Sequence, residues 1–107
     1  SEIQTVIDQY IETFRPREEI RDELDYECQI EGQSVILYEV RPVDFDPTRF
    51  TKMEIAKATY TKNTGMWKIY WMRASGRWEV YPHVREVSKL STFFTIVKKD
   101  EYHAFFG

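Results

Sequence analysis

The sequence contains few of the residues that cross-link or interrupt a chain. Its 107 residues include one cysteine, four glycines and four prolines. A single cysteine cannot form an internal disulfide, so nothing indicates an oxidising compartment, and no glycine-rich loop is present to bind phosphate. No apolar run approaches the roughly 20 residues that span a bilayer, and the acidic, amphipathic first ten residues do not resemble a signal peptide. We therefore expect a cytoplasmic protein that does not associate with membranes.

Apolar residues make up 42% of the chain and aromatic residues 16%, which is typical of a folded protein. A chain of this length predicts a single domain over residues 1–107. Charge is divided unevenly along it. Residues 1–50 have 5 basic and 13 acidic side chains, a net charge of −8, whereas residues 51–107 have 10 and 5, a net charge of +5. The simplest interpretation is that the two halves attract each other within the fold.

Apolar residues at helical spacing predict three helices. The first is ended by Pro16, which also suits the start of a short second helix that buries Ile20 and Leu24. Ser88 is a suitable N-cap for the third. The apolar stripes of the first and third helices are Ile3, Val6, Ile7, Tyr10, Ile11 and Phe14, and Leu90, Phe93, Phe94 and Val97.

Between these helices the apolar residues alternate, which predicts five strands at residues 25–31, 34–41, 53–62, 66–73 and 77–81. Residues 42–50, with two prolines and two aspartates, predict a loop. Connections of even length are expected to turn Trp67, Ile69, Trp71, Trp78 and Val80 toward the core, with Ala56, Ala58 and Tyr60 beside them. The predicted fold is α+β: an antiparallel five-stranded meander with two N-terminal helices and one C-terminal helix on one face.

Three segments, "IEGQSVILYEVRP", "IAKATYTKNTGMWKIYWMRASGRWEVYP" and the ending "HAFFG", resemble a family of small bacterial proteins catalogued as domain of unknown function 3024. The resemblance rests on the hairpin at "IEGQ", a W-x-x-Y-W-x-R strand that begins at Trp67, a W-x-x-Y strand that begins at Trp78, and the ending that contains His103. Ala104 and Phe105 depart from the glycine and cysteine typical of that ending. The resemblance implies a single-domain bacterial protein, and it implies no activity, cofactor or site.

The residues between the tryptophans are the ones predicted to face away from the core. They would form an exposed aromatic patch, of the kind that marks a surface for a protein partner or for self-association. We therefore predict a non-catalytic binding or interaction module, with neither a cofactor nor a bound metal. Its candidate binding residues are Lys57, Lys68, Tyr70, Met72, Arg77 and Tyr81.

Two alternatives remain open from the sequence. The same basic and aromatic face would suit single-stranded nucleic acid, whose bases stack on aromatic rings, although the chain is acidic overall. A small metal-dependent hydrolase would instead require Asp25, Glu27 and Glu39 to converge, with a basic residue such as Arg41 nearby. Cys28, His83 and His103 lack the spacing of a zinc site, and Cys28 is expected to be a buried, inert thiol.

Overall fold

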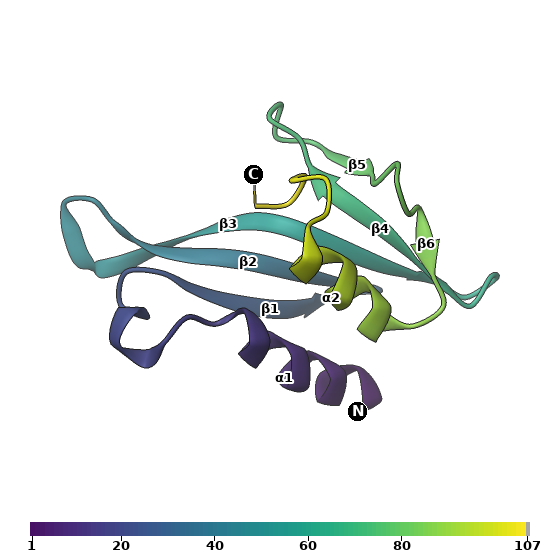
Figure 1. Cartoon of the computed structure of the whole chain (residues 1–107), viewed down its shortest axis with the longest axis horizontal. Coiled ribbons are helices and arrows are strands. Elements are labelled where there is room, and N and C mark those ends of the chain that lie inside the picture. The colour runs from purple at the N-terminus through teal and green to yellow at the C-terminus, as the bar shows by residue number, and fades with distance from the viewer. Residues whose placement is uncertain (107) are drawn as a thin grey trace.

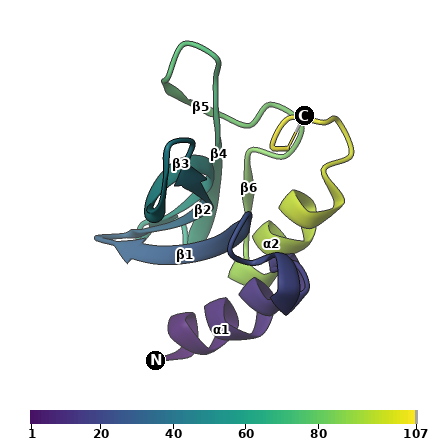
Figure 2. The ribbon, with the colours of Figure 1, turned by 90° about the vertical axis from the view of Figure 1, so that its left-hand side faces the viewer.

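A computed structural model describes residues 1–106 of the chain as an α+β fold with two layers. An antiparallel sheet forms one layer, and two helices lie together on one of its faces, called here the inner face (Figures 1 and 2). No helix among these residues is long and apolar enough to cross a bilayer. The elements are α1 (Glu2–Phe14), a 3-10 helix (Glu18–Ile20), β1 (Asp25–Glu31), β2 (Ser34–Val43), β3 (Asp46–Thr61), β4 (Met66–Met72), β5 (Trp78–Val80), β6 (Glu86–Val87) and α2 (Leu90–Lys99).

The sheet has the predicted meander order β1-β2-β3-β4-β5, with the short strand β6 added along β4. The predicted register of β3 on β4 is confirmed, since Ala56, Ala58 and Tyr60 lie opposite Trp71, Ile69 and Trp67. The small alanines leave room on the inner face for large neighbours, which explains why this register buries the most apolar surface. Strand β6 was not predicted, because its two residues are too few to show an alternating pattern.

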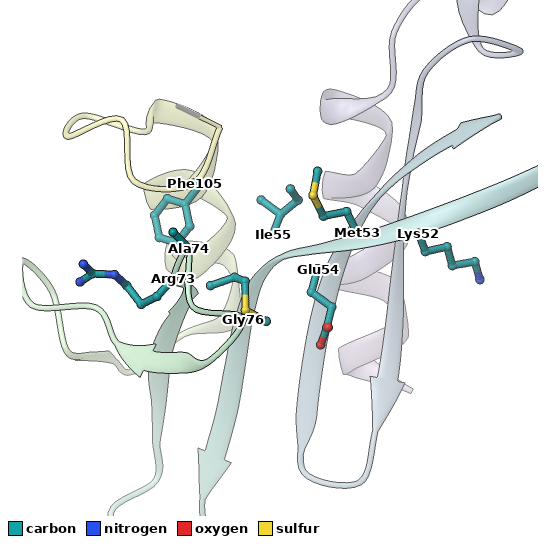
Figure 3. A pocket seen from close by; sticks show the side chains of 9 residues that line it. Lys52, Met53, Glu54, Ile55, Arg73, Ala74, Gly76 and Phe105 are labelled. Atoms are coloured by element: carbon teal, nitrogen blue, oxygen red, sulfur yellow. The ribbon is translucent and has the colours of Figure 1, made fainter. Parts of the chain in front are cut away.

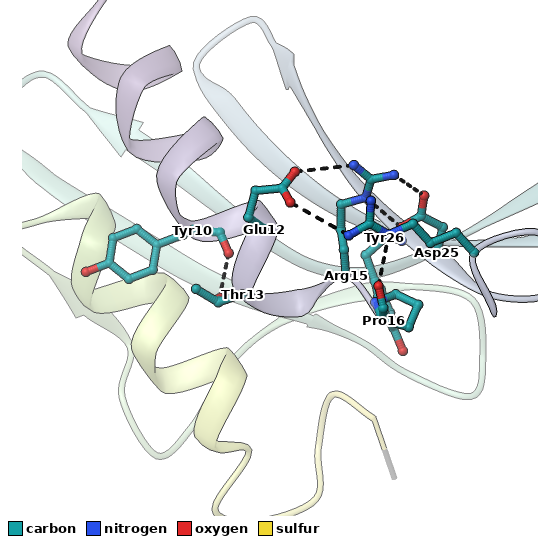
Figure 4. Close-up of polar contacts among 8 residues, drawn as sticks. Tyr10, Glu12, Thr13, Arg15, Pro16, Asp25 and Tyr26 are labelled. Carbon is teal, nitrogen blue, oxygen red and sulfur yellow. Dashed lines mark hydrogen bonds and ion pairs between the residues drawn. The ribbon is translucent and has the colours of Figure 1, made fainter. Parts of the chain in front are cut away.

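The predicted second helix is wrong, and only one 3-10 turn forms between α1 and β1. Arg15, at the end of α1, donates two hydrogen bonds to the carboxylate of Asp25, at the start of β1, with distances of 2.9 and 2.8 Å (Figure 4). This ion pair holds both ends of the connecting segment together. Arg21 also donates to the carbonyl of Pro16, at 2.9 Å, which folds the segment back on itself. Within this closed segment the helical residues are Glu18–Ile20.

The predicted loop at residues 42–50 is also wrong. Strands β2 and β3 continue almost to the tip of a long hairpin, whose turn is Asp44 and Phe45 (Figure 1). Its prolines are tolerated because the strand pairing shifts register between Pro42 and Val43, where ladder hydrogen bonds are interrupted. We call residues 40–53 of this hairpin the arm, because they extend beyond the strands β4 and β5.

A β-bulge in β3 marks the base of the arm. Leu37 pairs with Ala56 and the next residue, Tyr38, pairs with Glu54, so that Ile55 is an extra residue in β3. Strict alternation would turn Ile55 outward and Glu54 inward. The bulge instead lets Ile55 join the buried core and places Glu54 opposite Tyr38 on the other face.

The core lies between the inner face of the sheet and the two helices. Phe93 and Phe94 of α2 are fully buried, and Tyr10 of α1 stacks on Phe94 with ring centroids 5.6 Å apart. Helix α2 begins at Leu90, after Lys89, so the expected N-cap at Ser88 is wrong by one residue. The apolar stripes that were predicted for α1 and α2 are therefore the surfaces that bind the helices to the sheet.

The C-terminal tail is anchored by a buried carboxylate. Asp100 ends α2 in a left-handed conformation with φ of 42°, and its two oxygens accept hydrogen bonds from the backbone N–H groups of Phe105 and Phe106, each at 3.0 Å. These bonds hold Phe105 against Tyr81 in the core, with ring centroids 4.9 Å apart. The tail therefore packs on the inner face, beside the helices.

We predict that Asp100→Gly lowers the free energy of unfolding by about 3 kcal/mol, because it removes two charge-assisted hydrogen bonds and leaves two N–H groups unpaired. Glycine adopts the left-handed conformation without strain, so no new backbone strain adds to the loss. Urea unfolding followed by tryptophan fluorescence measures it. Asp100→Asn keeps one acceptor oxygen and is expected to lose about half as much. A loss below about 0.5 kcal/mol for Asp100→Gly would show that the tail is not held by this residue.

Candidate functional site

The candidate site is the outer face of the sheet, on the side opposite α1, α2 and the tail (Figure 2). Strand register defines its members, because side chains alternate between the two faces. One row crosses five strands, and a neighbouring row adds charged residues. The first row is Gln29, Ile36, Lys57, Tyr70 and Val80, and the second is Glu31, Ser34, Thr59, Lys68 and Glu86.

Lys57 is at the centre of an aromatic cluster on this face. Its ammonium group lies 4.7 Å from the ring centroid of Tyr70 and 4.8 Å from that of Trp78. Contact with two rings is favourable for a cation that has lost part of its water. Burial lowers the pKa of Lys57 from its ordinary value of 10.5, although the neighbouring Glu54 opposes this shift. The cluster therefore combines a fixed positive charge with half-buried aromatic surface.

Strand register places four of the six candidate residues on the outer face: Lys57, Lys68, Tyr70 and Met72. The expectation that Tyr81 faces outward is wrong. Its side chain is 2% exposed and lies in the core, where its ring contacts those of Trp71 and Phe105. Arg77 pairs with Arg73 at the end of the hairpin, so the alternation assigns it to the same side as Trp71.

Tyr81 and Arg77 face inward because of the connection between β4 and β5. The N–H of Arg73 donates to the carbonyl of Arg77, which leaves the three residues Ala74, Ser75 and Gly76 in the loop, with Gly76 at φ of 83°. A three-residue loop with a left-handed glycine is a common hairpin connection. The predicted strands 66–73 and 77–81 leave these same three residues between them, so the even length expected for this connection was wrong, and the odd length reverses the faces of β5. Trp78 and Val80 consequently pair with Met72 and Tyr70 on the outer face.

An apolar strip along β2 extends the cluster toward the arm. Ile36 is buried at its centre, although it lies outside the main core, and Phe50 of β3 lies opposite Pro42 near the tip. These residues were not among the candidates. The signal for them was that β2 is apolar on both faces, which indicates a strand that is covered on both sides. We call the following residues the outer patch: Ile36, Tyr38, Val40, Pro42, Phe50, Lys57, Tyr70, Met72, Trp78 and Val80.

Charges on the outer face are arranged by strand. Strand β1 contributes Glu27 and Glu31, whereas β3 and β4 contribute Lys57 and Lys68 beside the aromatic cluster. Part of this charge is already satisfied within the face. Lys52 forms an ion pair with Glu27, and the hydroxyl of Tyr38 donates to Glu31. The face is therefore acidic along β1 and mixed toward β4, where Glu86 of β6 lies opposite Lys68.

The three acids that a metal-dependent hydrolase would need do not converge. Glu27 pairs with Tyr38, whereas the next residue of β2, Glu39, faces the opposite side of the sheet and forms an ion pair with Arg41. Asp25 is held by Arg15, whose hydrogen bonds lower the pKa of that carboxyl. Among the residues that the structure describes, no three His, Cys, Asp or Glu side chains are grouped so that they could hold a metal.

A cleft of about 520 Å³ opens between the arm and the β4–β5 hairpin. In Figure 3 the side chains of β3 line one wall, and those of the hairpin line the other together with Phe105 of the tail. It lies where β3 has passed the last residue that pairs with β4, at Ala56. The residues that line the cleft are Lys52, Met53, Glu54, Ile55, Met72, Arg73, Ala74, Gly76 and Phe105.

Comparison with known families shows to which family the chain belongs. A family model described as a domain of unknown function, DUF3024, matches residues 1–107. The chain belongs to the DUF3024 family. The match spans the whole chain, including α1 and the arm, where the sequence resemblance was less clear. Neither a search of curated proteins nor a search of solved structures found a match. The function of this DUF3024 domain is therefore inferred from its own side chains.

We predict that the thiol of Cys28 is unreactive in the folded protein. Burial raises its pKa from an ordinary value of 9.0 to about 12, so its thiolate fraction at mildly alkaline pH is about a thousandfold below that of an unfolded chain. Alkylation by iodoacetamide, followed by mass spectrometry with and without urea, measures the ratio. The dependence of the alkylation rate on pH distinguishes a raised pKa of Cys28 from steric shielding of its thiol. The folded rate is expected to keep rising with pH above 9, where the unfolded rate levels off, and a shared plateau would contradict the raised pKa.

Proposed function

We propose that this protein is a non-catalytic interaction module that self-associates through the outer face of its sheet. The single observation that supports this most strongly is the outer patch. It gathers apolar and aromatic side chains of β2 to β5 on one face, and neither helix nor the described tail lies over it (Figure 2). Apolar patches of this kind on small domains mark interaction surfaces, because covering them removes apolar area from water.

The arrangement of charge favours a second copy as the partner. In a face-to-face pair with a two-fold axis that runs between β2 and β3, parallel to both, the acidic strand β1 of one copy lies over β4 of the other. Glu31 then approaches the region of Lys68, and the aromatic cluster around Lys57 packs against its neighbour's apolar strip. A two-fold interface makes each such contact twice, so this self-complementarity contributes to both affinity and orientation.

The alternatives have less support. Register places three basic residues on the outer face, Lys52, Lys57 and Lys68, against four acids, Glu27, Glu31, Glu54 and Glu86. Tight binding of single strands requires a positively charged groove along the phosphates. A metal-dependent hydrolase is disfavoured because Glu27 and Glu39 lie on opposite faces of β1 and β2.

We also infer a cytoplasmic location. It is supported by the chemistry of Cys28, which is a free thiol and the one cysteine of the sequence. Small domains of oxidising compartments commonly depend on disulfides, whereas this fold derives its core from the sheet and two helices.

We predict that light scattering finds a dimer whose stability depends on the outer patch. Tyr70→Glu removes one ring of the aromatic cluster and places a carboxylate beside Lys57, and it is expected to give monomers, because desolvating this ion pair inside the apolar interface costs several kcal/mol. Added salt should weaken the dimer, since part of its attraction is between exposed charges.

Tyr102→Glu is the matched control for this measurement. It makes the same substitution at a tyrosine that is 54% exposed and stacks on His83, away from the outer patch. This variant is expected to remain dimeric. A wild-type protein that stays monomeric at the highest attainable concentration would contradict self-association.

We predict no salt-dependent binding of fluorescent single-stranded DNA or RNA in anisotropy measurements. The acidic strand β1 repels phosphates, and the positive charge of Lys57 is already shared between two rings. Binding that rises at low salt and is weakened by Lys68→Glu would instead assign the outer face to nucleic acid.

A further inference from the structure

We propose that the cleft between the arm and the β4–β5 hairpin binds an extended peptide segment of another protein, which adds as a strand to the free edge of β3. The preferred segment has apolar side chains at alternate positions and acidic residues between them. This inference does not depend on self-association through the outer patch, because the apolar wall that it uses, formed by Met53, Ile55 and Phe105, lies outside that patch, and Met72 is the one lining residue that belongs to both.

The first support is the unpaired edge of β3. This strand has sixteen residues, and all of its pairs with β4 lie between Ala56 and Thr61. Residues 46–55 therefore have no strand on this side among residues 1–106, whereas on the other side Asp46 and residues 50–54 pair with β2. Backbone N–H and C=O groups along such an edge bond readily to an added strand, which is the basis of peptide recognition by β-augmentation.

The second support is the apolar side-chain surface within the cleft. Met53 is 56% exposed on the wall formed by β3, whereas Ile55 and Phe105 are almost fully buried. Figure 3 shows Met53 and Ile55 following one another along β3, with Ala74 and Phe105 on the other side of the cleft. An added strand directs every second side chain to one face, so alternate apolar residues of the peptide meet this surface. Methionine suits such a site because its flexible thioether adapts to different side chains.

The third support is the charge at the rim, which favours acidic residues in the peptide. Lys52 lies on one wall and Arg73 on the other, with Arg77 opposite Arg73 in the hairpin, and Glu54 is the one acid that lines the cleft. The ion pair of Arg73 with Glu79 is long, at 3.7 Å, and both side chains are about half exposed. The guanidinium of Arg73 also lies on the ring of Trp71, 4.3 Å from its centroid. An exposed ion pair of this kind contributes little, so a peptide carboxylate can replace Glu79 while Arg73 stays on Trp71.

The experiment selects ligands from a random peptide library displayed on phage, with the immobilised full chain as target. Enriched peptides are synthesised with a fluorescent label, and their affinities are measured by anisotropy. We expect a consensus of alternating apolar and acidic residues. Binding should fall more than tenfold with Met53→Asp, which places a carboxylate on the wall of the cleft against an acidic ligand. Arg73→Glu should weaken binding in the same direction.

Phe50→Asp is the matched control. Phe50 belongs to the same strand and is 51% exposed, close to the 56% of Met53, but it points to the outer face. It should leave peptide affinity unchanged while it disturbs the dimer, so that the two surfaces are tested separately. Because both positions are exposed, neither substitution is expected to unfold the chain.

Backbone chemistry tests the mode of binding. N-methylation of the peptide at alternate residues should abolish binding in one register and spare it in the other, because only every second N–H faces β3. Peptide binding should also slow hydrogen exchange of amides in residues 52–55. The proposal is overturned if no peptide is enriched, if Met53→Asp binds as well as Phe50→Asp, or if N-methylation in either register has no effect.

Discussion

The extra residue in β3 at Ile55 is the constraint on which the rest of the structure depends. Leu37 and Tyr38 are adjacent in β2, yet their partners Ala56 and Glu54 are separated by one residue. Without the bulge, strict alternation would turn Ile55 to the outer face and Glu54 toward the core. The bulge also bends the strand at the point where its pairing with β4 ends, because bulges increase local twist. The arm and the cleft beside it both follow from this one irregularity.

Much of the fold could be predicted because it depends on patterns that repeat. Alternation located the strands, and the match of small Ala56 and Ala58 to large Trp71 and Ile69 determined the register of β3 on β4. Alternation alone did not determine the faces of β5. Trp78 and Val80 lie on one side of this short strand and Tyr81 on the other, so apolar residues occupy both faces. The three-residue length of the connection from Ala74 to Gly76 decides that Tyr81 is the buried one.

The candidate surface was affected by the same ambiguity. Lys57 and Tyr70 could be assigned to the outer face from β3 and β4, whereas Trp78, which completes the cluster around Lys57, requires the odd loop. The arm was missed for a different reason. Pro42 and Pro47 are typical of loops, and only the shifted pairing near the tip allows both within a hairpin. Local propensity indicated a loop there, and pairing between the strands overrode it.

The exposed arm creates a risk of aggregation that its own sequence limits. A long free edge with Phe45 and Phe50 exposed is a template for uncontrolled strand pairing. Pro47 removes one hydrogen-bond donor from this strand. Arg49 and Lys52 add like charges, which oppose pairing with a second identical arm. The proline and the like charges oppose uncontrolled strand pairing along the arm. The edge of β3 next to the bulge at Ile55 stays available for an added strand. A strand that adds there has to match both the cationic rim and the surface around Met53, so the same residues that prevent aggregation also select the ligand.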